Sequence, residues 1–130
     1  MSPAPAPPRR VLYAEDDRVA ALLFTEALRE RGDYEVQVAE DGAEALAIVR
    51  DWPPDVLVLD AHLPDTSGLA LLAQLRQLAG LANVPAFVCS ADEQPEDQQR
   101  HLSAGFCGYW VKPIDRRRLL AELDRLPPTR

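Results

Sequence analysis

The chain has 130 residues, of which 47% are hydrophobic and 27% are charged, and its formal net charge is −7 at pH 7. This length fits one domain, and no apolar run is long enough to cross a bilayer, so the composition predicts a globular protein without membrane insertion. The negative charge also argues against nucleic-acid binding, which normally needs a basic surface.

The ends of the chain and its cysteines set further expectations. Residues 1–8 alternate proline and alanine without an apolar core, which predicts a disordered lead-in before a domain over residues 9–126 and a tail over 127–130. Cys89 and Cys107 both fall within predicted strands. Two thiols suggest neither a disulfide framework nor a metal cluster, so we expect a reducing, cytoplasmic setting.

From Arg9 onward, short strand-like runs alternate with helix-length segments five times. This alternation predicts an α/β fold in which a parallel sheet carries helices on both faces. The run 34–39 alternates apolar and polar residues and predicts an edge strand, whereas 56–59 is apolar throughout and predicts a central one. The remaining strands are expected at 11–14, 84–89 and 107–111.

Four of the five helical patterns have a recognisable start. Asp17 and Asp41 stand before the first and second helical patterns, where their side chains would accept backbone N–H bonds as N-caps. Ser67 opens the third helical pattern, and the last helix runs from Asp115. The apolar residues assigned to these four helices are Val19, Leu22, Leu23, Ala27 and Leu28; Ala45, Leu46 and Val49; Leu71, Leu72 and Leu75; and Leu119, Leu120, Leu123 and Leu126.

The fourth helical segment, 92–104, differs from the others. Its only apolar residues are Leu102 and Ala104, so little burial would anchor it and we expect it to be the least firmly held helix. His101 lies within it and is expected to be exposed.

Polar side chains follow the predicted strands at the ends where ligands bind in parallel sheets. The first strand is followed by Glu15, Asp16 and Asp17, the third by Asp60, the fourth by Ser90 and the fifth by Lys112. Clustered carboxylates repel one another unless a cation is present, and Mg²⁺ prefers such oxygen ligands. Asp60 could then attack phosphorus to form an aspartyl phosphate, with Lys112 and Ser90 contacting the phosphoryl oxygens.

These residues resemble the receiver domains of bacterial two-component response regulators. The resemblance covers Arg9 to about Leu126 and rests on four motifs: the acidic pair Glu15-Asp16, LDxxLPxxxG around Asp60, Ser90-Ala91, and Tyr109 three residues before Lys112-Pro113. It implies a flavodoxin-like (βα)5 doubly wound sheet of strand order 2-1-3-4-5. Residues 59–65 and 104–115 also look like receivers attached to hybrid sensor kinases.

The resemblance implies a role for each motif residue. Asp60 would be the phosphoacceptor, and Mg²⁺ would be held by Glu15, Asp16, Asp60 and the backbone carbonyl of His62, whose imidazole is expected to face solvent. Ser90 and Tyr109 would be the switch residues, and Lys112 the salt-bridge lysine. Pro113 would follow a cis peptide bond, and Gly68 would serve a tight turn into the third helix.

The function implied is a switch that is phosphorylated by a histidine kinase or a histidine phosphotransfer protein and then signals to an unidentified partner. It would catalyse its own phosphorylation and dephosphorylation without being a turnover enzyme. A homodimer through the fourth helix, fifth strand and fifth helix is a further hypothesis. Two alternatives stay open: a receiver-like interaction module that needs no phosphorylation, and a Mg²⁺-dependent phosphatase with an aspartate nucleophile.

Overall fold

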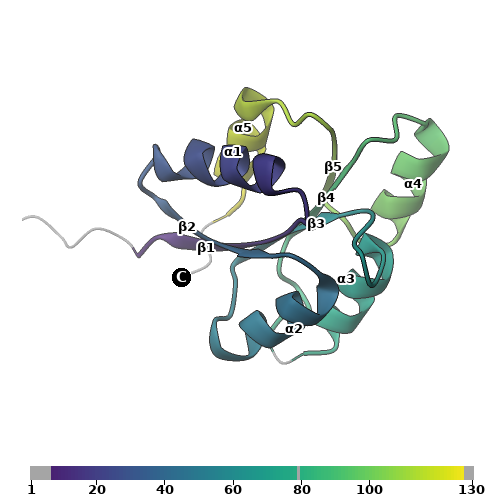
Figure 1. Ribbon diagram of the computed structural model, residues 1–130, viewed down its shortest axis with the longest axis horizontal. Coiled ribbons are helices and arrows are strands. Elements are labelled where there is room, and N and C mark those ends of the chain that lie inside the picture. The colour runs from purple at the N-terminus through teal and green to yellow at the C-terminus, as the bar shows by residue number, and fades with distance from the viewer. Residues whose placement is uncertain (1–6, 79, 128–130) are drawn as a thin grey trace, which may run out of the picture.

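A computed structural model of the chain describes residues 7–78 and 80–127, in which five strands alternate with five helices (Figure 1). The predicted lead-in over 1–8 and tail over 127–130 therefore fall mostly outside the described residues. The strands are β1 (Arg9–Ala14), β2 (Tyr34–Ala39), β3 (Val56–Asp60), β4 (Ala86–Ser90) and β5 (Gly108–Val111). The helices are α1 (Arg18–Arg29), α2 (Gly42–Asp51), α3 (Gly68–Arg76), α4 (Pro95–Ser103) and α5 (Arg116–Asp124).

The strands form one parallel sheet in the order β2-β1-β3-β4-β5, which confirms the predicted fold class and strand order. β2 lies at an edge, and every residue of the central strand β3 is buried, as the two sequence patterns predicted. The register pairs Asp60 with Cys89 and Ser90 with Val111 at the carboxyl ends of their strands. Polar residues that follow different strands are thereby brought to one edge of the sheet.

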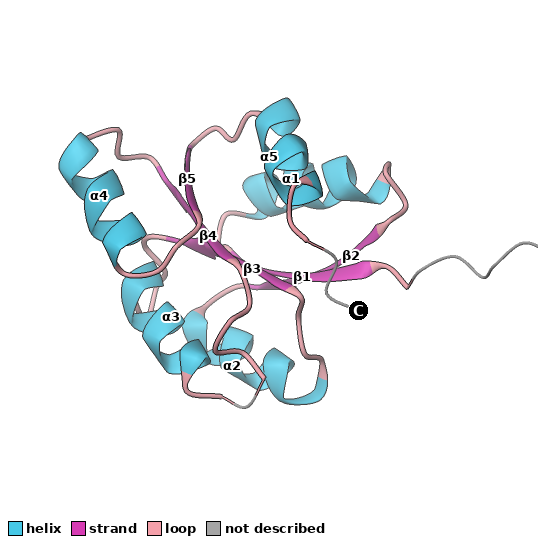
Figure 2. Cartoon of the chain, turned by 180° about the vertical axis from the view of Figure 1, so that it is seen from behind, coloured by secondary structure: helices cyan, strands magenta, loops and turns pink. Residues whose placement is uncertain are grey.

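Helices cover both faces of the sheet (Figure 2). α1 and α5 lie on one face over a core that includes Tyr13, Phe24 and Trp110. On the other face, α2 and α3 pack over a second core that includes Leu59 and Leu71, and α4 lies beside β5 at the end of this layer.

The predicted helix starts are confirmed. Asp17, Asp41, Ser67 and Asp115 are N-cap residues, and the side chain of each accepts a hydrogen bond from a backbone N–H in the first turn. Such a bond satisfies one of the donors that a helix start leaves unpaired. These caps fix where α1, α2, α3 and α5 leave the loops that surround the carboxyl edge of the sheet.

The buried side of α1 differs from the apolar set assigned to it. Ala27 and Leu28 are buried, but Val19, Leu22 and Leu23 are between 61% and 67% exposed. Phe24 is buried in their place, with its ring centroid 4.2 Å from that of Tyr13 on β1. α1 therefore turns an aromatic residue toward the sheet and leaves an apolar strip facing outward.

Two expectations for single residues were wrong. His101, which belongs to α4, is only 2% exposed, because its ring packs against the rings of Phe106 and Tyr109, at centroid distances of 5.7 Å and 5.4 Å. Cys107 lies before β5 and is exposed, whereas Cys89 is buried within β4 as predicted. The anchor of α4 is thus an imidazole, whereas Leu102, one of the two apolar residues noted in this segment, is 43% exposed.

Candidate functional site

Four buried or partly buried polar side chains lie at the carboxyl edge of the sheet. Glu15 directly follows β1, Asp60 ends β3 and Ser90 ends β4, and they are 1%, 6% and 2% exposed. Lys112 follows β5 and is partly buried. Burying charged groups is unfavourable unless each finds a partner, so the contacts among these side chains decide what the site can do.

Lys112 joins the two buried carboxylates. Its Nζ atom lies 2.6 Å from Oδ2 of Asp60 and 2.6 Å from Oε1 of Glu15. The lysine is placed by its backbone N–H, which donates to the Ser90 carbonyl at 2.8 Å. The peptide bond from Lys112 to Pro113 is cis, as expected.

Burial and hydrogen bonding shift the two carboxylates in opposite directions. Burial raises the pKa of Glu15 to about 7, and the hydrogen bond with Asp60 adds to the rise. Burial also acts to raise the pKa of Asp60, but hydrogen bonds from Glu15, the His62 N–H and Lys112 hold this pKa below its ordinary value. Asp60 is therefore the carboxylate that the surroundings keep ionised.

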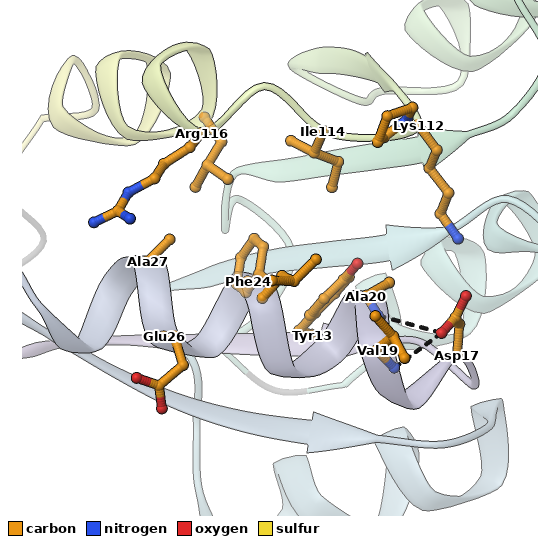
Figure 3. Close-up of a pocket in the computed structure, with 13 residues that line it drawn as sticks. Tyr13, Asp17, Val19, Ala20, Phe24, Glu26, Ala27, Lys112, Ile114 and Arg116 are labelled. Carbon is orange, nitrogen blue, oxygen red and sulfur yellow. Dashed lines mark hydrogen bonds between the residues drawn. The ribbon is translucent and has the colours of Figure 1, made fainter.

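Carboxylate oxygens of Glu15, Asp16 and Asp60 all lie within 4.8 Å of one another. Asp16 is exposed and the other two are buried, so the group opens to solvent on one side. An all-oxygen donor set of this kind suits a hard divalent cation such as Mg²⁺. Asp17 has a different task, since its carboxylate caps α1 by accepting from Val19 and Ala20, as shown in Figure 3.

The loop after β3 is fixed by its backbone. The His62 N–H donates to Oδ1 of Asp60 at 2.9 Å, and the His62 side chain is exposed as expected. Gly68, the first residue of α3, donates its N–H to the Ala61 carbonyl at 3.0 Å. A Cβ atom at Gly68 would lie 2.7 Å from the Asp60 carbonyl oxygen, so glycine is needed here for close backbone approach.

Ser90 and Tyr109 each contact the loop that leads into α4. The Ser90 Oγ atom accepts from the Asp92 N–H at 3.1 Å. The Tyr109 hydroxyl is turned inward and donates to the Asp92 carbonyl at 2.8 Å and to Oδ2 of Asp97 at 2.5 Å. Both residues therefore connect the strand ends to the position of α4.

One contact at the site was not predicted. The Tyr13 hydroxyl donates to Oε1 of Glu15 at 3.0 Å, although the run 11–14 was interpreted as apolar strand only. The signal was the two-residue spacing, because residues 13 and 15 of an extended chain point to the same side.

A groove of about 570 Å³ runs between α1 and α5 toward the site (Figure 3). Val19, Leu23 and Phe24 line it on the α1 side, and Ile114 lines it on the α5 side. Lys112 and Asp17 also border it, so an apolar surface lies directly beside the charged site.

Residues 11–124 match one family, described as the response regulator receiver domain. The probable transcriptional regulatory protein TcrX of Mycobacterium tuberculosis is 36% identical over 97% of this chain and 53% of its own length. The chain thus spans about half the length of the first curated relatives that it matches.

Two solved structures show the same fold. The chemotaxis response regulator CheY4 of Vibrio cholerae superposes with a TM-score of 0.83 at 28% identity, over 91% of this chain and 98% of the other. The receiver domain of the sensor histidine kinase PA1611 of Pseudomonas aeruginosa gives a TM-score of 0.81 at 27% identity, over 91% and 96% of the two chains. That structure has a magnesium ion coordinated in its active-site cleft. Among the described residues of the present chain, no helix has the length and apolar character needed to span a membrane.

Proposed function

The chain belongs to the response regulator receiver domains, and from this premise we propose that it accepts a phosphoryl group on Asp60 from a phosphohistidine and signals the change to a partner. One observation carries the proposal. Asp60 is a buried carboxylate with Lys112 Nζ at 2.6 Å, and its oxygens lie within 4.8 Å of those of Glu15 and Asp16. A nucleophile, a cation and a divalent-metal ligand set therefore meet at one strand end.

In the proposed transfer, an Asp60 oxygen forms a bond to phosphorus as the phosphorus–nitrogen bond of the phosphohistidine breaks, and the imidazole leaves. Glu15, Asp16, Asp60 and the His62 carbonyl would hold Mg²⁺, which neutralises charge on the phosphoryl oxygens when bound. Lys112 already contacts Asp60 and would pair with a phosphoryl oxygen, and the Ser90 hydroxyl would donate to another.

The phosphodonor must be a protein that brings its histidine to the mouth of the site. The α1–α5 groove supports this part of the proposal, because its apolar lining is continuous with Lys112 and Asp17. Val19, Leu22 and Leu23 add exposed apolar surface on α1. We propose that a sensor histidine kinase or histidine phosphotransfer protein docks here, in the cytoplasm.

The response would pass through Ser90 and Tyr109 to the surface formed by α4, β5 and α5. If the Ser90 hydroxyl turns to donate to a phosphoryl oxygen, its Oγ atom moves relative to the Asp92 N–H that now donates to it. The Asp92 carbonyl also accepts a hydrogen bond from the Tyr109 hydroxyl, which contacts the carboxylate of Asp97 on α4. A change at Asp60 thus has a connected path to α4, where a downstream partner or a second copy would bind.

The test is intact-mass spectrometry after incubation with Mg²⁺ and acetyl phosphate. Wild type is expected to gain the mass of one phosphoryl group, and Asp60→Asn is expected to gain none. An equal gain in both proteins would reject Asp60 as the acceptor. No gain in wild type would favour an interaction module that needs no phosphorylation, and repeated release of phosphate from a phosphomonoester would favour the phosphatase.

A further inference from the structure

Tyr13 is a polar residue in the middle of an apolar layer. It is fully buried on β1, in the core between the sheet and α1, and its ring packs against Phe24. A phenylalanine would fill the same space, and a buried tyrosine hydroxyl normally needs a hydrogen-bond partner. That partner is Glu15, whose Oε1 atom lies 3.0 Å from the hydroxyl.

The hydroxyl acts as a donor in this contact. A phenol keeps its proton at neutral pH and a carboxylate can only accept, so the Tyr13 hydroxyl is the donor to Glu15. Its other neighbour is the Cys89 sulfur at 3.9 Å, and burial raises the pKa of that thiol to about 12. The thiol is therefore neutral, and the carboxylate is the stronger acceptor of the two.

The donors to Glu15 differ in how free they are to move. Lys112 reaches Oε1 at 2.6 Å, but in the proposed function this lysine also pairs with the phosphoryl group. The Asp17 N–H donates to Oε2 at 3.3 Å, and Tyr13 donates to Oε1 from inside the core. Tyr13 and the Asp17 backbone are thus the contacts that can hold Glu15 while Lys112 turns to another partner.

We infer that Tyr13 is a positioning residue for the metal site, and that its hydroxyl fixes the Glu15 carboxylate in the orientation that binds a divalent cation. This inference rests on the proposed function, which assigns Glu15 to the metal. Groups that orient metal ligands from behind often change metal affinity 10–100-fold when removed. The hydroxyl of Tyr13 has the geometry of such a group.

The test measures binding of Mn²⁺, which also takes oxygen ligands, from the electron paramagnetic resonance signal of the free ion. Tyr13→Phe is expected to bind Mn²⁺ about tenfold more weakly than wild type. Tyr34→Phe is the matched control, because the Tyr34 hydroxyl also donates to a carboxylate, Asp124 at 2.9 Å, away from the site. Val58→Ala controls for lost stability, since Val58 pairs with Tyr13 in the sheet and is buried without being placed in the site. Both controls are expected to keep wild-type affinity.

A double-mutant cycle shows whether Tyr13 acts through Glu15. In a Glu15→Gln background, Tyr13→Phe is expected to cause little further loss of Mn²⁺ affinity. Wild-type affinity in Tyr13→Phe, or an equal loss in Val58→Ala, would overturn the inference while leaving phosphorylation of Asp60 intact by mass. Absence of Mn²⁺ binding in wild type would overturn the metal site and this inference together.

Discussion

At the scale of single residues, Lys112 balances the charges of the site. Glu15 and Asp60 are both buried, and each places an oxygen 2.6 Å from Nζ of Lys112. Burial alone would lower the pKa of Lys112, but the hydrogen bonds to Asp60 and Glu15 raise it above its ordinary value. The lysine is thus held as the charged partner that lets two carboxylates occupy a small buried space.

We therefore expect Lys112→Met to be strongly destabilising in metal-free buffer. The change leaves two buried carboxylates without their cation, and breaking a buried pair in this way costs about 3 kcal/mol, at the lower end of the usual range because Lys112 is partly exposed. Urea denaturation measures the loss. Arg29→Met is the control, because the pair of Arg29 with Glu26 lies on the surface and its removal should have no measurable effect. A similar stability for the two variants would contradict this view of Lys112.

At the scale of elements, α4 is the helix whose buried side the sequence pattern did not predict. The sequence predicted a helical segment over 92–104, and α4 spans Pro95–Ser103 within it. Its buried side was not predicted, because counting aliphatic residues overlooks an imidazole. His101 packs against Phe106 and Tyr109, and its Nδ1 atom lies 2.7 Å from the Asp97 carbonyl oxygen. These ring partners belong to the chain after the helix, so only the tertiary structure brings them together.

His101→Ala is expected to loosen α4 more than any change on its exposed side. Removing a buried ring leaves a cavity, and we expect a loss of about 2–4 kcal/mol in the free energy of unfolding. Hydrogen exchange of the α4 amides should accelerate as well. Leu102→Ala is the control, because Leu102 is 43% exposed and its loss should be well below 1 kcal/mol. Equal effects of the two substitutions would show that His101 does not anchor the helix.

For the other elements as well, some features could be predicted from neighbouring residues and others depend on the tertiary structure. The N-caps at Asp17, Asp41, Ser67 and Asp115 were predictable because a cap bonds only to backbone within three residues. The strand ends were sufficient to bring Glu15, Asp60 and Lys112 together in one site. The outward strip of α1 was not predicted, because it depends on the packing of Phe24 against Tyr13 of β1. The Tyr13 hydroxyl was missed although its partner Glu15 is two residues away, because the run 11–14 was interpreted as apolar strand only.

At the scale of the whole molecule, the site connects segments that are far apart in the chain. Glu15 follows β1, Asp60 ends β3 and Lys112 follows β5, and the parallel order of the sheet places all three at one edge. A ligand that binds both Glu15 and Asp60 joins the carboxyl ends of β1 and β3. Binding at this edge should therefore stabilise the complete fold, because the ligand set exists only when the sheet is assembled.

Mg²⁺ is accordingly expected to raise the melting temperature of wild type, and a chelator should reverse the rise. At a Mg²⁺ concentration 100-fold above its dissociation constant, the gain is about 2.7 kcal/mol, which corresponds to roughly ten degrees for a domain of this size. Asp16→Ala should abolish most of this gain without lowering metal-free stability, because Asp16 is exposed and its removal lessens the repulsion within the carboxylate group at the site. Glu40→Ala is the control, since Glu40 is an exposed acid that follows β2 outside that group. Differential scanning calorimetry with and without Mg²⁺ makes the comparison, and an undiminished gain in Asp16→Ala would place the cation elsewhere on this acidic molecule.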